Sequence, residues 1–124
     1  MTADELLFFD RWPQLVPLYE KLSDGLRRTY PDMTIKVSKT QISFCNRRMF
    51  AMVSLPEKRK KEWPREFLMV SFGLDHPLES SRVAAKAEPY PDRWTHHVIV
   101  EHMEDLDGEL LGWIDAAHRF ARGK

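Results

Sequence analysis

The chain contains only one cysteine and five glycines, and it carries no net charge at neutral pH. The single Cys45 excludes an internal disulfide and favours a reducing compartment. Phe67-Leu68-Met69-Val70 is typical of the longest apolar runs, whereas a membrane helix needs roughly 20 such residues. The acidic opening MTADELLFFD lacks the basic start and long apolar stretch of a signal peptide. We therefore expect a cytoplasmic protein without a membrane partner.

What the chain does contain is enough apolar material for one core. Hydrophobic residues make up 43% of its 124 residues. A chain of this length buries roughly two-thirds of its unfolded surface without metal or disulfide bridges. The sequence shows no internal repeat, low-complexity tract or linker. We therefore expect a single domain over residues 1–124.

The charges cancel in total but are unevenly distributed. Nine of the nineteen Lys and Arg residues lie between Lys36 and Arg65, where the only acids are Glu57 and Glu62. This segment therefore carries a formal charge of +7, and the ten bases and seventeen acids elsewhere give −7. Such segregation predicts contact with an anion, but it does not identify which one.

Helical patterns open and close the chain. Thr2 and Glu5 have the spacing of a capping box, which predicts a short first helix. A longer helix follows, because leucines recur at spacings of three and four, and Pro17 either kinks this helix or begins it. Near the C-terminus, Asp105 or Asp107 is expected to cap a third helix.

Between these helices, apolar residues alternate with polar ones, which is the period of half-buried strands. Segments 33–38 and 41–45 show this alternation, and 49–55, 67–74, 83–87 and 95–101 are expected to complete the sheet as further strands. Short connections, such as the hairpin turn Asn46-Arg47-Arg48, indicate antiparallel neighbours. The predicted fold class is α+β, an antiparallel sheet of five or six strands with the N- and C-terminal helices packed on one face.

The sheet face opposite the helices has a mixed composition, and the alternation places Phe50, Met52, Phe67 and Met69 on it. A sheet face open to water usually shows a cleaner polar row. Three explanations stay open. The 56–65 loop folds over this face, a homodimer forms through those four residues, or the face contains a ligand groove.

Two stretches, KVSKTQISFCNRRMFAMV and EPYPDRWTHHVIV, carry the most specific motifs. Together with VSFGL, they resemble an uncharacterised bacterial family of domains of unknown function, over roughly Phe8 to Phe120. The resemblance implies a K-V-S-K-T-Q-I-S-F strand pair, an R-W-T-H-H strand and a closing helix, but little chemistry. It also implies an accessory module, since similar domains end longer, nuclease-like proteins. The order of elements is similar to that of YjbR-type domains.

The resemblance marks nine signature positions as candidate ligand-binding residues: Lys36, Ser38, Lys39, Thr40, Gln41, Arg93, Trp94, His96 and His97. Their cationic, hydroxyl, amide and imidazole groups suit an oxyanion. We expect Lys39, Arg93 and His96 to converge on one pocket. The alternative is structural, with the Lys-Ser-Lys-Thr run as a solvated strand end and Trp94 fixing the sheet against the last helix.

A basic and aromatic set suggests nucleic-acid binding as an alternative: Arg47, Arg48, Lys58, Arg59, Lys60, Lys61, Trp63 and Arg65. Cations can contact successive phosphates, and an indole can stack on a base. The zero net charge argues against a dedicated DNA-binding domain. A charge run of this kind is also typical of a solvated loop.

Catalytic and metal-binding motifs are lacking. Neighbouring strand residues such as His96 and His97 leave on opposite faces, so they do not share one ion, and neither HExxH nor Cys-x-x-Cys occurs. We expect no metal and no cofactor. A cryptic hydrolase built from Asp75, His76, His96 and Arg93 remains an alternative. The sequence favours a non-enzymatic binding or interaction module whose partner is a small anionic molecule or a protein.

Overall fold

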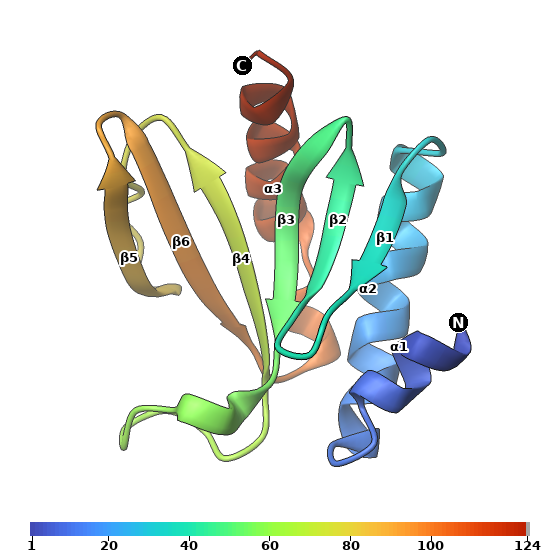
Figure 1. The fold of residues 1–124 in the computed structure, drawn as a ribbon. Helices are drawn as coiled ribbons and strands as arrows, with labels where there is room; N and C mark the ends of the chain where they lie inside the picture. Colours follow the sequence, from blue (N-terminus) through green and yellow to red (C-terminus); the bar gives the residue numbers. More distant parts are fainter. Residues whose placement is uncertain (124) are drawn as a thin grey trace.

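The centre of the molecule is a six-stranded antiparallel sheet with strand order β1-β2-β3-β4-β6-β5 (Figure 1). The computed structural model describes residues 1–123, leaving out Lys124 and the side chain of Lys58. The strands are β1 (Thr34–Val37), β2 (Ile42–Asn46), β3 (Arg48–Ser54), β4 (Leu68–Leu74), β5 (Val83–Tyr90) and β6 (Arg93–Val100). The helices are α1 (Ala3–Phe8), α2 (Val16–Thr29) and α3 (Gly108–Arg122), with 3₁₀ turns η1 (Pro13–Leu15), η2 (Pro56–Lys58) and η3 (Met103–Asp105). The predicted α+β class is confirmed.

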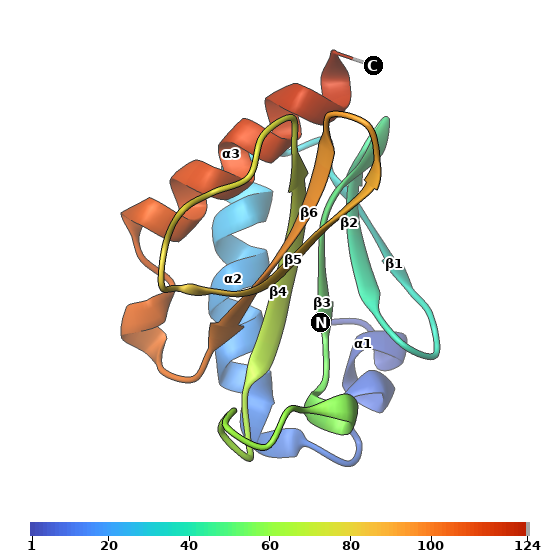
Figure 2. The same ribbon diagram turned by 90° about the vertical axis from the view of Figure 1, so that its left-hand side faces the viewer.

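Helices α2 and α3 pack on one face of the sheet, as Figure 2 shows from the side. The core lies between them and a row of cross-strand neighbours, Val53, Val70 and Val98, each 0% exposed. Within residues 1–123, no helix covers the opposite face, which we call the open face. Its side chains include Met52, Ser54, Met69, Ser71 and His97. Among residues 1–123, no helix is long and apolar enough to span a membrane.

The helix starts follow the predicted chemistry. Thr2 and Glu5 form the capping box of α1. Helix α2 begins at Val16, and Pro17 lies in its first turn, where the missing amide removes no helical hydrogen bond. Asp107 caps α3 by accepting a hydrogen bond from the Leu110 amide at 3.0 Å.

A β-bulge turns Phe50 away from the open face. The register between β2 and β3 shifts by one residue after the Phe44–Ala51 pair, so Phe50 is the extra residue. Its ring contacts those of Tyr30 and His118, with centroids 5.2 and 5.0 Å apart. The prediction that Phe50 lies on the face away from the helices is therefore wrong, because the bulge interrupts the period-two alternation.

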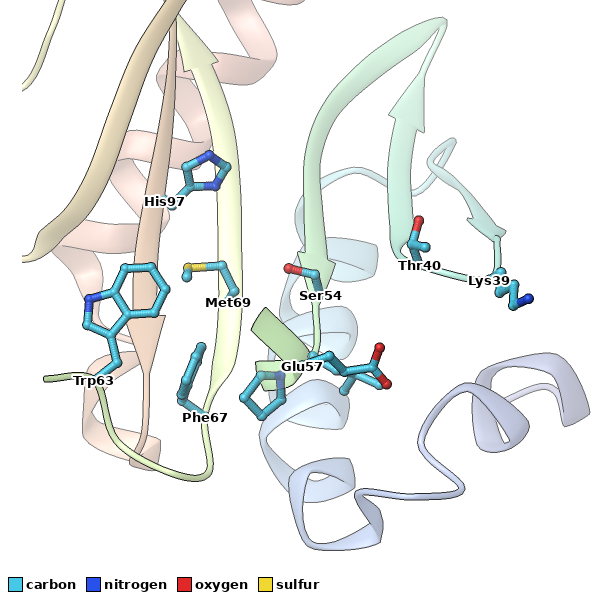
Figure 3. Close-up of a pocket in the computed structure, with 10 residues that line it drawn as sticks. Lys39, Thr40, Ser54, Glu57, Trp63, Phe67, Met69 and His97 are labelled. Carbon is cyan, nitrogen blue, oxygen red and sulfur yellow. The ribbon is translucent and has the colours of Figure 1, made fainter. Parts of the chain in front are cut away.

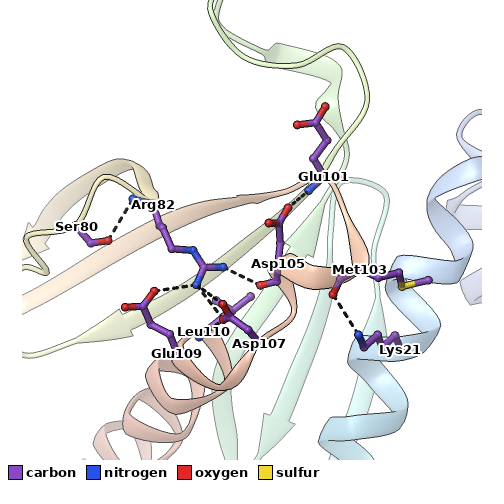
Figure 4. A network of polar contacts seen from close by, with 9 residues as sticks. All are labelled: Lys21, Ser80, Arg82, Glu101, Met103, Asp105, Asp107, Glu109 and Leu110. Atoms are coloured by element: carbon purple, nitrogen blue, oxygen red, sulfur yellow. Dashed lines mark hydrogen bonds and ion pairs between the residues drawn. The ribbon is translucent and has the colours of Figure 1, made fainter.

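Arg82 joins the segment before β5 to the start of α3 (Figure 4). Its guanidinium donates to the Asp107 carboxylate at 2.9 and 3.1 Å, to Glu109 at 2.9 Å and to the Asp105 carbonyl at 2.7 Å. It also lies 5.7 Å from the ring centroid of Trp113. These contacts stabilise the edge of the sheet that carries β5 against the helical layer.

Candidate functional site

A pocket with a volume of ≈ 390 Å³ opens on the open face, beside the segment that joins β3 to β4 (Figure 3). Its walls come from the β1–β2 turn, the end of β3, segment 55–67, β4 and β6. The lining residues are Lys39, Thr40, Ser54, Leu55, Pro56, Glu57, Trp63, Phe67, Met69 and His97. The pocket therefore combines residues that lie far apart in the sequence.

The floor of the pocket is apolar. Phe67 and Met69 are 1% and 8% exposed. The Trp63 indole packs edge-on against Phe67, with ring centroids 6.0 Å apart and planes at 88°. The 56–65 loop was expected to fold over Phe50 and Phe67; it contacts Phe67, whereas Phe50 packs against Tyr30 and His118 on the other face. A hollow remains between the loop and the β1–β2 turn.

One lysine lines the pocket and a second lies beside its Trp63 wall. Lys39 is exposed at the β1–β2 turn, and it has no hydrogen bond or ion pair with any residue in the described range 1–123. Lys60 Nζ lies 5.5 Å from the centroid of the Trp63 ring. Glu57 lines the same rim, and its carboxylate is 3.7 Å from the guanidinium of Arg11. This ion pair offsets part of the negative charge at the rim, weakly because both groups are solvated.

His97 and Ser71 form a hydrogen-bonded pair between β6 and β4. The two residues are directly opposite in the register, and Ser71 Oγ lies 2.6 Å from His97 Nδ1. Ser71 is 2% exposed, whereas His97 lines the pocket. Burial lowers the pKa of His97, so the imidazole is neutral at pH 7. The sequence pattern places Ser71 on the same face as Met69, but Ser71 was not among the predicted ligand-binding residues.

The predicted ligand-binding residues separate into groups. Lys39, Thr40 and His97 gather at the pocket. Ser38 donates its hydroxyl to the Gln41 carbonyl at 3.0 Å, which stabilises the β1–β2 turn, and the Gln41 amide donates to the Ser43 hydroxyl at 3.0 Å. These two side chains serve the hairpin.

Lys36 is exposed on β1, where it pairs with Ser43 in the row that leads to Met52. It lies on the open face but does not line the pocket. Trp94 is half-buried and pairs with Leu74 at the far end of β4. Neither side chain contributes to the pocket.

The expected convergence of Lys39, Arg93 and His96 is not found. His96 is 0% exposed, faces the helices and stacks on Phe72 with ring centroids 5.3 Å apart. Arg93 begins β6, and its guanidinium lies 6.0 Å from the Phe120 ring on α3. The prediction was wrong because His96 and His97 point to opposite faces, and Arg93 lies about 13 Å along the strand from His97.

The predicted nucleic-acid set does not form one surface. Arg47 and Arg48 lie at the β2–β3 turn, at the opposite end of β3 from the 56–66 segment (Figure 1). Trp63 is half-buried by its packing on Phe67. The remaining members with described side chains, Arg59, Lys60, Lys61 and Arg65, are exposed, while the Lys58 side chain lies outside the described part. Nucleic-acid binding stays a prediction.

The groups suggested for a hydrolase are poorly placed for catalysis. Asp75 and His76 are exposed and hydrogen-bond each other at 2.7 Å. His96 is enclosed, and the Leu78 amide donates to its Nε2 at 3.0 Å. Burial also lowers the pKa of His96 below its ordinary value. Within residues 1–123, no cluster of three His, Cys, Asp or Glu side chains could hold a metal ion.

Fold and pocket define a small α+β domain with a lined hollow on the helix-free face of its sheet. The chain belongs to the family described as Domain of unknown function (DUF5655), whose model matches residues 7–121. Searches of curated proteins and of solved structures found no significant match. The likeness to YjbR-type domains, the link to nuclease-like proteins and the cytoplasmic location stay predictions.

Proposed function

We propose that this domain binds a small, flat and largely apolar molecule that carries a negative charge. The observation that supports the proposal is the pocket on the open face, where an apolar floor lies near Lys39 and near the Trp63 ring that Lys60 approaches. Binding sites for small molecules are typically hollows of about 300–1,000 Å³ with apolar walls and a few polar groups. The pocket has this size and this composition.

The shape of the ligand follows from the floor. Trp63, Phe67 and Met69 offer a ring, a second ring at nearly a right angle and a flexible thioether. Aromatic and thioether groups favour contact with flat rings. A flat apolar body therefore fits this floor better than a sugar or a free inorganic anion does.

The charge of the ligand follows from the surroundings. Lys39 lines the pocket and Lys60 lies beside Trp63, and both belong to the 36–65 segment with its formal charge of +7. A long lysine side chain on the surface can turn toward a bound anion. Binding should therefore weaken as salt is added, because exposed charges are screened.

Binding is favoured over catalysis because, among the described residues that line the pocket, no hydroxyl or amine is hydrogen-bonded to His97 or Glu57. The Ser71 hydroxyl is the group closest to an imidazole nitrogen, at 2.6 Å, but Ser71 is 2% exposed and does not line the pocket. A homodimer through the open face stays a second proposal. Of the residues predicted for it, Phe67 and Met69 are buried and Met52 is half-buried.

Isothermal titration with three ligands of equal shape tests the proposed function. 2-Naphthoate is an anion, 2-naphthamide is neutral and 2-naphthylmethylamine is a cation. We expect naphthoate to bind with a dissociation constant of about 1 mM or tighter, as ligands of this size allow, and to bind more tightly than the other two. Absence of binding by all three, or equal affinity for the amine, would overturn the proposal.

Variants locate the binding in the pocket. Trp63→Ala should weaken naphthoate binding by about tenfold, because one wall of the pocket is lost. Lys39→Ala should weaken it less and should reduce its salt dependence. Lys36→Ala is the matched control, since it removes an exposed lysine from the same hairpin without touching the pocket. Thermal melting checks that each variant is folded.

A further inference from the structure

The end of the pocket that faces β6 has one polar ring, the His97 imidazole, and its protonation can be deduced from Ser71. A neutral imidazole carries one proton, on Nδ1 or on Nε2, and the partner of one nitrogen decides the position. Here the partner of Nδ1 is the Ser71 hydroxyl at 2.6 Å. The position of the ring proton therefore depends on whether Ser71 or His97 donates in this hydrogen bond.

The Ser71 hydroxyl needs an acceptor for its proton. Ser71 is 2% exposed, and among residues 1–123 its hydroxyl has no hydrogen-bond partner other than His97 Nδ1. A buried O–H without an acceptor costs about 1–3 kcal/mol. The hydroxyl therefore donates to Nδ1, which must be unprotonated, and the proton of the neutral ring lies on Nε2.

The protonated nitrogen reaches the pocket. His97 Nε2 has no hydrogen bond with any residue in the described range. It is also not enclosed, because the buried unpaired nitrogens of the described chain belong to His96 and His118. Since His97 lines the pocket, its Nε2–H is available to a ligand.

A second neutral donor lies across the floor. Ser54 pairs with Met69, and both line the pocket. In Figure 3 the Ser54 hydroxyl points toward Met69, and His97 lies on the other strand that flanks it. A hydroxyl and an imidazole N–H beside an apolar floor suit a flat ring that carries an anionic acceptor group.

We infer that the ligand is an aromatic carboxylate whose carboxylate oxygen accepts the Nε2–H of His97, and that Ser71 is the positioning residue that fixes this tautomer. The inference rests on the proposed function and specifies which group supplies the negative charge. Burial lowers the pKa of His97, which agrees with a neutral ring that carries a single proton. The cations near the pocket then attract the ligand, while the neutral donors orient it.

Long-range proton–nitrogen NMR correlations of the imidazole ring test the tautomer without any ligand. At pH 7.5, His97 should show a protonated Nε2 and an unprotonated Nδ1. Ser71→Ala should give a mixture of both tautomers, whereas Ser71→Thr, which keeps the hydroxyl, should restore the wild-type pattern. A protonated Nδ1 in the wild type, or an unchanged pattern in Ser71→Ala, would overturn the assignment.

Titration with 2-naphthoate tests the ligand. His97→Phe keeps a ring but loses the donor, so it should weaken binding by about tenfold, the effect of one good hydrogen bond. His97→Gln places an amide N–H at a similar reach and should retain most of the affinity. If naphthoate binds His97→Phe as tightly as the wild type, the inference fails and the proposed function stands. If naphthoate does not bind the wild type, the proposed function and the ligand assignment fail together.

Discussion

Two neighbouring histidines show how strongly the environment of a residue decides its role. His96 and His97 follow each other in β6, yet His96 points into the helical layer and His97 points to the open face. The Leu78 amide donates to His96, and Ser71 hydrogen-bonds His97. His96 therefore holds the segment after β4 in place, while His97 keeps one nitrogen available to a ligand.

Arg82 is the residue whose loss should cost most among the surface cations. Arg82→Ala removes its hydrogen bonds to Asp107, Glu109 and the Asp105 carbonyl. We expect the free energy of unfolding to fall by about 2 kcal/mol, which is typical of hydrogen bonds to charged groups. Urea denaturation measures this free energy.

Arg28→Ala is the matched control, because Arg28 is exposed on α2. The stability of this variant should stay within about 0.5 kcal/mol of the wild type. Equal stability of the two variants would contradict the structural role of Arg82.

Some pocket residues could be predicted from the sequence and others could not. Lys39, Thr40 and His97 have polar side chains within recognisable motifs. Ser71 was missed because its partner depends on the register between β4 and β6, which no local pattern specifies. Trp63 was assigned to nucleic acid because its packing on Phe67 depends on the path of a loop.

At the scale of elements, two irregular segments shape the open face. The bulge in β3 transfers Phe50 to the core, and the segment between β3 and β4 brings Trp63 over Phe67. The bulge thereby adds Phe50 to the core on the helical side. The loop forms one wall of the pocket on the open face. Sequence periodicity describes regular strands well and gives no signal for either irregularity.

The β5–β6 hairpin is another place where sequence periodicity did not predict the ends of the strands. The predicted strands cover 83–87 and 95–101, but β5 continues to Tyr90 and β6 starts at Arg93. Pro89 does not end the strand because β5 is at the edge of the sheet, where a missing amide hydrogen bond is tolerated. Asp92, with a φ of 60°, makes the tight turn instead.

Helix α1 is docked by a buried carboxylate. Glu5 is 1% exposed and accepts hydrogen bonds from the Tyr19 hydroxyl and from the Thr2 amide. Tyr19→Phe should lower the free energy of unfolding by about 1–3 kcal/mol, because a buried acceptor loses a donor. Tyr90→Phe, at an exposed position, is the control and should change little. Equal unfolding midpoints in urea for the two variants would contradict this docking.

At the scale of the whole molecule, the basic segment of residues 36–65 does not form one continuous patch. Its cations lie at both ends of β3, with Arg47 and Arg48 at one end and Lys39 and Lys60 near the other (Figure 1). The segregation of charge along the sequence is therefore not a segregation onto one surface. The proposed pocket lies at the end that carries Lys39.

Histidine burial should make the stability of the whole domain depend on pH. Burial lowers the pKa of His96, His97 and His118 below the ordinary value near 6.5. The unfolded chain then binds more protons than the folded one as the pH falls below 6.5. The free energy of unfolding should therefore fall on acidification through this range, by at most about 1.4 kcal/mol per pH unit for each histidine.

Urea denaturation between pH 7.5 and pH 5 measures this dependence. His118→Phe keeps the ring that stacks on Tyr30, with centroids 4.1 Å apart in the wild type, but removes the titrating group. Its stability should vary less steeply with pH than that of the wild type. A wild-type profile that is flat between pH 7 and pH 5 would contradict the account.

The most direct test of the binding site is a proton–nitrogen NMR titration of the labelled domain with 2-naphthoate. The account predicts shifts of the Trp63 indole N–H and of the Met69 and His97 amides, while the amides of Arg47 and Arg48, at the other end of β3, stay unchanged. Shifts confined to Arg47 and Arg48, or no shifts at millimolar ligand, would contradict a ligand site on the open face.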